Sequence, residues 1–369
     1  MERHRQRSVA FLALLAVSMA AGAGAGAAAV AQSSSVRAPV QPRVVSEPVR
    51  HDTDDPAIWV DPADPARTLI VGTDKDIDGA LYVFGLDGRI KPERVVRGLL
   101  RPNNVDIARG VMLGGKPVDV VIVAERFANR LRVYALPGMQ PVDGGGIPVF
   151  EGERARDVMG VAAWVRPVDG ALLVAVSRSD RHAPKQGYLH QYRLVDDGAG
   201  RLAGLFVRAF GEWSGRKEIE ALSVDAKGGH LFASDETFGL RKHRVDPAAE
   251  DADDELAAFG LTGFARDHEG SAVMRDAAGR AWLWVSDQQA GALRVFDLAG
   301  SPGSPVEPRF IGHVRFAARE TDGIDLVTGD LPGFPGGLLV AMSDDRTFHF
   351  YAIDDLLQAL VPAATPARR

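Results

Sequence analysis

The chain has 369 residues, of which 46% are hydrophobic and 25% are charged, a composition that supports a large buried core and excludes an intrinsically disordered protein. Its formal net charge is −6, which argues against a general nucleic-acid-binding protein.

Residues 1–31 have the features of a secretory signal peptide. A basic head, MERHRQR, precedes the apolar run SVAFLALLAVSMA, and Ala29-Val30-Ala31 forms a small-residue cleavage site. We expect cleavage near Ala31/Gln32 and a secreted or periplasmic protein, with a membrane anchor as the alternative. No later segment approaches the roughly 20 apolar residues of a membrane span, so we expect no membrane association after cleavage. Cysteine is absent, so an exported chain must be stabilised by packing, bound ions or both rather than by disulfides.

Six segments of the remaining chain repeat one pattern. Each has an apolar strand, a polar or acidic turn, a second strand of alternating pattern and a stop rich in Gly, Pro or Asp. The segments are residues 69–88, 121–138, 172–198, 230–247, 282–300 and 338–355. A shorter apolar segment precedes each of them, at residues 57–60, 105–107, 161–165, 222–224, 272–274 and 324–327.

The spacing of these repeats, roughly 50 residues, is typical of propeller blades. We therefore predict an all-β fold, a six-bladed β-propeller with four-stranded antiparallel blades, in preference to a pair of β-sandwiches. Residues 32–360 form its single domain, and residues 36–50 are expected to supply the outer strand of the sixth blade, which closes the ring and covers a sheet edge. Residues 361–369 are expected to form a flexible tail, and the protein is expected to be a monomer.

In each blade the start of the inner strand and the end of the second strand lie at the same end, because the two strands are antiparallel. Charged or carboxamide residues occupy both places in nearly every blade. Those at the inner strands are Asp54-Asp55, Asn103-Asn104, Arg156-Asp157, Glu218/Glu220, Asp267/Glu269 and Thr321-Asp322. Those at the second strands are Asp74-Lys75, Glu125-Arg126, Arg178/Asp180, Asp235-Glu236, Asp287 and Asp344-Asp345. Carboxylates crowded at one end of the ring repel one another unless cations lie between them, and oxygen donors without cysteine favour Ca²⁺, with Mg²⁺ second.

Lys75 and Arg126 stand among these acids, with Arg178 and Lys185 nearby. Since Arg and Lys both bind phosphate oxygens, calcium ions flanked by these bases would suit a polyanionic substrate. The expected chemistry is metal-assisted hydrolysis, in which ions bridge an attacking water and a phosphoryl oxygen while a carboxylate accepts the proton. The sequence lacks a Cys nucleophile, a G-x-S-x-G elbow, a G-x-x-x-x-G-K-[ST] loop and an H-x-x-x-H pair, which argues against other reaction classes.

Seven stretches carry a resemblance to a known family. They are DDPAIWVDP (54–62), TDKDIDGALYVFGLDG (73–88), NNVDI (103–107), KEIEALSVD (217–225), DHEG (267–270), TDGID (321–325) and GGLLVAMSDD (336–345). In this order and spacing they resemble the β-propeller phytases, a calcium-dependent family that hydrolyses phytate. The similarity runs from about Val49 to Ile353 and implies a six-bladed propeller with several bound Ca²⁺ ions, some structural and some at a cleavage site, beside a second phosphate site.

The resemblance also implies roles for individual residues. The acids that match ligands of the ions at the cleavage site are Asp54, Glu220, Glu236, Asp267, Glu269 and Asp322. Asp55, with the backbone oxygens of Pro56 and Val105, matches the cage of a further ion. Lys75 and Arg126 match phosphate-binding residues. We expect catalysis to depend on Asp54, Lys75, Arg126, Glu220 and Glu236.

The chain departs from the family pattern in three places. Met159 stands where many members have Tyr, which removes a phosphate hydrogen bond. Arg178-Ser179 and the inserted DRHAPKQG replace a Lys-Glu pair, so Arg178 and Lys185 are the expected bases of the second phosphate site. The acid-rich loop before TDGID is shortened to Glu320, which argues against one structural calcium site.

The function that we expect is a secreted phosphoric monoester hydrolase of the 3-phytase type. It would act on phytate, as its calcium complex, by direct attack of a Ca²⁺-bridged water. One alternative is a non-catalytic, Ca²⁺-dependent propeller that binds phosphorylated ligands. Another is a Ca²⁺-dependent propeller lactonase or esterase, which needs few ligands and an apolar cleft.

Overall fold

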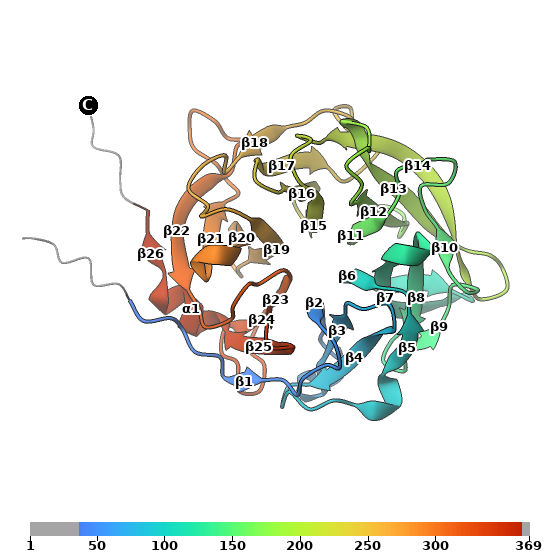
Figure 1. Ribbon diagram of the computed structural model, residues 1–369, viewed down its shortest axis with the longest axis horizontal. Helices are drawn as coiled ribbons and strands as arrows, with labels where there is room; N and C mark the ends of the chain where they lie inside the picture. Colours follow the sequence, from blue (N-terminus) through green and yellow to red (C-terminus); the bar gives the residue numbers. More distant parts are fainter. Residues whose placement is uncertain (1–36, 364–369) are drawn as a thin grey trace, which may run out of the picture. The chain divides into compact units, whose positions relative to one another are not determined.

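The computed structural model describes residues 37–363, and the expected signal peptide lies outside them. In the described part, six antiparallel sheets follow one another around a central axis (Figure 1). The predicted six-bladed β-propeller is therefore confirmed. The same part of the chain contains no helix that is both long and apolar enough to cross a membrane.

The first three blades are built in chain order from the axis outward. Blade one consists of β2 (Thr53–Trp59), β3 (Leu69–Asp74), β4 (Gly79–Gly85) and β5 (Val96–Leu99). Blade two consists of β6 (Pro102–Leu113), β7 (Lys116–Glu125), β8 (Arg130–Ala135) and β10 (Ile147–Pro148), with the short β9 (Gln140–Pro141) also paired to β8. Blade three consists of β11 (Val158–Val165), β12 (Leu172–Arg178), β13 (Gln186–Asp196) and β14 (Leu202–Glu212).

The last three blades follow the same plan, with both ends of the described chain added to them. Blade four consists of β15 (Ile219–Asp225), β16 (His230–Asp235), β17 (Gly239–Arg244) and β18 (Ala257–Phe259). Blade five consists of β19 (His268–Arg275), β20 (Ala281–Asp287), β21 (Ala292–Asp297), β22 (Arg309–Arg315) and β26 (Val361–Pro362). Blade six consists of β23 (Ile324–Thr328), β24 (Gly337–Ser343), β25 (Thr347–Ala352) and β1 (Val44–Val45). The helical elements are η1 (Pro65–Arg67), η2 (Pro92–Arg94), η3 (Arg126–Ala128), η4 (Gln288–Ala290) and α1 (Ile353–Ala359).

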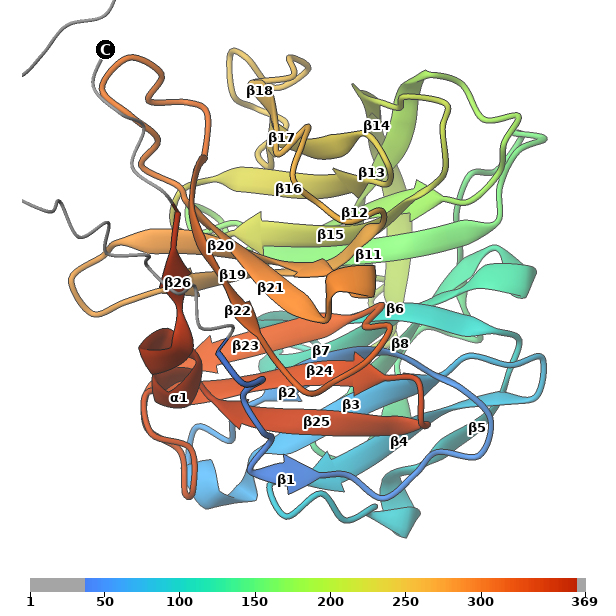
Figure 2. The ribbon, with the colours of Figure 1, turned by 60° about the vertical axis from the view of Figure 1, so that its left-hand side comes forward.

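The ring closes through the N-terminal strand, as the sequence predicted. β1 pairs antiparallel with β25, and Val44 lies opposite Phe350. The expected tail is wrong for its first residues, because β26 pairs with β22 and the Ala363 N–H donates to the Ile311 carbonyl at 2.8 Å. α1 separates β25 from β26 in the chain and buries Ile353 and Leu356. This helix returns the chain to the open edge of blade five (Figure 2).

The core lies between the blades. Each blade is covered on both faces by its neighbours, so its inner strands are continuous apolar runs such as Leu69-Ile70-Val71, which is almost wholly buried. One hydrophobic cluster fills each gap between adjacent blades. Between blades six and one, for example, Ile70 and Phe84 pack with Phe348. The ring is therefore one continuous core around a polar centre.

Carboxylates join neighbouring inner strands around the axis. Asp55 Oδ2 accepts the Val105 N–H at 2.9 Å, and Asp106 Oδ2 accepts the Ala163 N–H at 2.7 Å. Asp325 Oδ2 accepts the Ile58 N–H at 2.7 Å, which connects blade six to blade one. These bonds hold the inner strands in a fixed position relative to one another, on which the site is built.

Candidate functional site

The first half of the site connects blades one, two, five and six. The Lys75 Nζ, just after β3, lies 2.6 Å from Asp54 Oδ1 and 2.9 Å from Asp322 Oδ2. Asn103 Nδ2 donates to Asp54 Oδ2 at 2.9 Å, and Gln288 Nε2 donates to Asp322 Oδ1 at 2.6 Å. Asp54 is fully buried, so its carboxylate is held in one orientation by these partners.

The second half connects blades four and five around one lysine. The Lys217 Nζ contacts Glu236 directly and lies 3.5 Å from Asp267 Oδ2 and 3.4 Å from Glu269 Oε1. Glu236 follows β16, whereas Asp267 and Glu269 stand at the start of β19. All three acids are buried.

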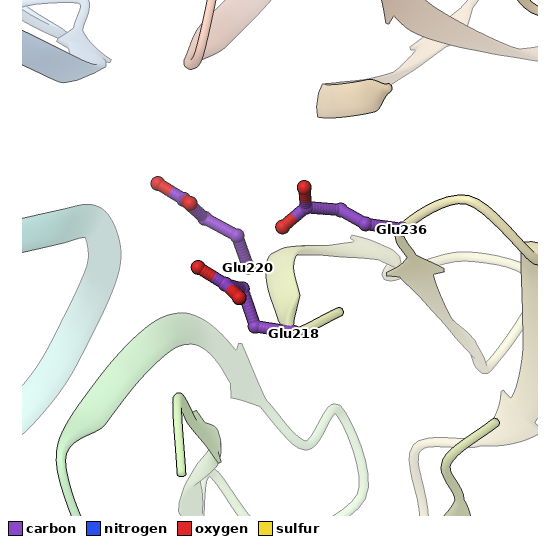
Figure 3. Close-up of side chains that lie close together, drawn as sticks. All are labelled: Glu218, Glu220 and Glu236. Carbon is purple, nitrogen blue, oxygen red and sulfur yellow. The ribbon is translucent and has the colours of Figure 1, made fainter. Parts of the chain in front are cut away.

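Glu220, near the start of β15, joins the two halves. One oxygen each from Glu218, Glu220 and Glu236 lies within 4.8 Å of the others, and the same holds for Glu236, Asp267 and Glu269. Figure 3 shows Glu218 and Glu220 projecting side by side from one strand end, with the Glu236 carboxylate facing them from a neighbouring segment. The predicted acids of blades one, four, five and six therefore form one cluster.

The electrostatics of this cluster are unfavourable without further positive charge. Burial raises the pKa of Glu236 to about 8, with Glu220 adding to the effect, and burial raises the pKa of Asp322 to about 6. The pKa values of Glu220 and Glu269 lie well above their ordinary range, because of burial first and neighbouring carboxylates second. Burial alone lowers the pKa of Lys75, but Asp54, Asp322 and Glu220 outweigh it and raise that pKa.

A hard divalent cation fits this donor set. The cluster offers only oxygen ligands, and two buried oxygens, Glu236 Oε1 and Glu269 Oε2, have no hydrogen-bond partner among the described residues. Buried carboxylate oxygens without partners are costly unless a cation or donor reaches them. Oxygen-only sets with several carboxylates are those that Ca²⁺ prefers.

The residues expected to cage a further ion lie together at the axis. Asp55, Pro56 and Val105 line a cavity of about 240 Å³ between the inner strands, and Asp106 and Asp325 line it too. Burial raises the pKa of Asp55 well above its ordinary range, and the charges of Asp54, Asp325 and Asp106 add to this.

Of the expected phosphate-binding bases, Arg126 is available and Arg178 is not. The Arg126 guanidinium, half-buried at the start of η3, donates from Nη2 to Ser179 Oγ at 2.7 Å, and its Nε has no partner in the described structure. Arg178 is 0% exposed, pairs with Glu153, and donates to the carbonyls of Ala155, Gly187 and Tyr188. Its expected role in substrate binding is therefore wrong, because blade three uses every side of its guanidinium internally.

Lys185 lies at a separate cleft beside the cluster. It is exposed, and its ammonium end packs against Gly215. Next to it lies a cleft of about 410 Å³ whose lining includes Arg181, Arg216 and Lys217. Met159, where many family members have Tyr, is buried in β11 and offers no hydroxyl.

The acids that end the second strands serve the blades rather than the site. They accept backbone N–H groups from the loop that leads into the inner strand, in the pairs Asp74 with Asp52, Glu125 with Leu100, Asp235 with Ser214 and Asp287 with Ala265. The expectation that these acids share the ion-binding rim is therefore wrong. In these four blades the next residues are Lys75, Arg126, Glu236 and Gln288, and all of them except Arg126 contact a member of the acid cluster directly.

Sequence reasoning missed Lys217 and Gln288 as site residues. Lys217 stands inside the KEIEALSVD stretch, so its position two residues before β15 was a usable signal. Gln288 follows Asp287, and its place matches that of Lys75 after Asp74.

The sequence of the chain is similar to those of known phytases. A family model described as Phytase matches residues 5–355. The chain is also similar to a 3-phytase from Bacillus subtilis (strain 168), with 25% identity over 315 residues, which cover 82% of this chain and 77% of the relative.

Proposed function

Because the chain belongs to the phytase family, a family of hydrolases that act on phosphate esters, we propose that it removes phosphate from phytate in a Ca²⁺-dependent reaction. The observation that carries this proposal is the joining of acids from four blades, with Lys75 paired to two of them, into one cluster. A lactonase is less well supported, because so many carboxylates are not needed around a single ion.

The acids Asp54, Glu220, Glu236, Asp267, Glu269 and Asp322 would hold the ions at the cleavage site, and Asp55 with the carbonyls of Pro56 and Val105 would hold one at the axis. When bound, Ca²⁺ would supply positive charge to the phosphoryl oxygens and to the attacking water. Glu218 and Lys217 border the same ligand set.

The chain's own side chains would position the phosphate and move the proton. The Lys75 ammonium would provide a point charge and the Arg126 guanidinium paired N–H donors for phosphate oxygens. The Nε of Arg126 is buried and has no hydrogen-bond partner among the described residues. Glu220 is buried and near Asp54 and Glu269, whose charges favour its protonated form. With that proton displaced by a bound cation, Glu220 would present a carboxylate of high proton affinity, which is suited to accept the proton of an attacking water.

A second phosphate of the substrate would lie in the cleft lined by Arg181, Arg216 and Lys217, with Lys185 at its border. This assignment replaces Arg178, whose guanidinium is enclosed. The 3-phytase activity named for the Bacillus relative is extended to this chain as part of the proposal. The position of the phosphate lost first, determined by NMR of the product, tests that part.

Release of inorganic phosphate from phytate at pH 7–8 tests the proposal, in Ca²⁺ and in excess EDTA. Turnover is expected only with Ca²⁺. Absence of release at every Ca²⁺ concentration, combined with calorimetric binding of phytate, would instead identify a binding module. We further propose that the chain is exported by residues 1–31 and acts as a monomer, which N-terminal sequencing of the mature protein and light scattering test.

A further inference from the structure

Lys217 carries an ammonium group into a place that suits a metal ion. Its Nζ contacts Glu236 and lies within 3.5 Å of oxygens of Asp267 and Glu269. These three buried acids also form one of the two oxygen clusters compact enough to hold a metal in the described residues. We propose that Lys217 is a tethered counter-ion that occupies one cation position of the metal-free protein and leaves it when a divalent cation binds. The inference rests on the proposed cation site and deepens it.

Geometry makes the two cations exclude one another. Ca²⁺ binds carboxylate oxygens at about 2.3–2.6 Å. An ion that shares the oxygens of Glu236, Asp267 and Glu269 would therefore lie within about 5 Å of the present ammonium position and compete with it for the same oxygens. Unscreened positive charges at that separation repel strongly in a buried setting. The ammonium must move before the ion can bind all three acids.

The charge balance explains why a lysine stabilises the metal-free state here. Glu236 is fully buried, and its Oε1 and the Glu269 Oε2 lack hydrogen-bond donors in the described part of the chain. Among the residues that the structure describes, these acids would have no positive partner within ion-pair distance without Lys217 except Arg266, which pairs with Asp267 alone. A single tethered charge compensates part of this repulsion, and a divalent ion compensates more.

The cleft beside the acid cluster can accommodate the displaced Lys217 side chain. Lys217 has an unbranched side chain that is 40% exposed, and it lines the cleft of about 410 Å³ with Arg181 and Arg216. Moved toward that cleft, its ammonium would join two guanidinium groups in a region suited to a phosphate. Metal binding would therefore add a phosphate-binding base at the same time as it fills the acid cluster.

The test compares the variants Lys217→Met and Lys227→Met with the unaltered chain. Met keeps the apolar stem and removes the charge, and Lys227 is an exposed lysine of the turn between β15 and β16 in the same blade. Ca²⁺ alone is titrated by calorimetry into chelator-treated protein, and thermal unfolding is followed in EDTA and in Ca²⁺.

We expect Lys217→Met to bind Ca²⁺ at this site about tenfold more tightly, or to gain a binding event, because the ion no longer displaces charge-assisted bonds. Its unfolding temperature should fall in EDTA and recover in Ca²⁺, whereas Lys227→Met should match the unaltered chain. Equal Ca²⁺ affinity and an equal EDTA response in Lys217→Met would overturn the inference, as would an absence of Ca²⁺ binding in all three proteins.

Two further readouts separate this inference from the proposed function. Tighter Ca²⁺ binding by Lys217→Met without phosphate release from phytate supports the counter-ion and contradicts the phytase proposal. In saturating Ca²⁺, an active enzyme should show a several-fold higher KM for phytate in Lys217→Met, because the cleft has lost a base. An unchanged KM would show that the displaced lysine does not reach the substrate.

Discussion

The metal-free protein should lose stability as the pH rises from 5 to 8. Folding raises the pKa of Glu236 from its ordinary 4.5 to about 8, through burial and the charge of Glu220. Between these two values the folded state binds more protons than the unfolded state, so the free energy of unfolding falls with pH. Since one pKa unit corresponds to about 1.4 kcal/mol, full ionisation of Glu236 costs the folded protein up to about 5 kcal/mol.

Asp322, whose pKa is raised to about 6, acts in the same direction at lower pH. At about 2 °C of unfolding temperature per kcal/mol for a domain of this size, the combined decrease should be roughly 10 °C. The assay is thermal unfolding by circular dichroism in EDTA between pH 5 and pH 8, repeated in saturating Ca²⁺. Ca²⁺ should abolish the decrease, and Glu236→Gln should reduce it. An unfolding temperature in EDTA that stays constant over this range would refute the reasoning that the buried acids need a cation.

Three substitutions separate the roles of individual side chains. Glu220→Gln should lower kcat by about 10²–10⁴ through loss of the proton acceptor. It should not lower the unfolding temperature in EDTA, because it removes repulsion with Asp54 and Glu269. Retained turnover in phosphate-release assays would contradict the role of Glu220 as proton acceptor. Arg126→Met should raise the KM for phytate roughly tenfold with little change in unfolding, because its one described side-chain hydrogen bond is to Ser179; an unchanged KM would exclude it from substrate binding. Arg178→Met should lower the free energy of unfolding, measured in urea, by about 3 kcal/mol, because it removes the donor to three carbonyls and to Glu153. A variant with native stability and a raised KM would show instead that Arg178 binds the substrate.

The fold and the position of the acid cluster could be predicted because both follow from repetition. Strand pairs that recur along the chain must stack as blades, and the antiparallel pairing then sends Asp54, Glu220 and Asp322 to the same end of the ring. That step needs no knowledge of side-chain contacts. It depends only on which residues open the inner strands.

The separate roles of two residues that are adjacent at the end of a strand could not be predicted in this way. Side chains alternate between the faces of a strand, so adjacent residues such as Asp74 and Lys75 point to different surroundings. The sequence shows a charged pair at the end of a strand but not which member faces the axis. In blade three the same uncertainty concerned Arg178 and Ser179, and the structure encloses the arginine.

Contacts between residues far apart in the sequence were the second feature that could not be predicted. Lys217 meets Glu236, Asp267 and Glu269 from two blades, and only the packing of those blades brings the four together. The chain after α1 was likewise expected to be a tail, because Val361–Pro362 is too short to read as a strand. It becomes one because β22 offers an unpaired edge.

The pairing of β1 with β25 has a consequence for the order of folding. Val44 and Phe350 are about 300 positions apart, so this contact has one of the longest loop closures available to the chain. The first four strands of each of blades one to five are consecutive in sequence, whereas the four strands of blade six require the beginning and the end of the domain together. Closure of the ring is therefore expected to be a late event, and a chain deprived of residues 37–50 would retain its local hairpins while exposing the edge of β25 to association with other molecules.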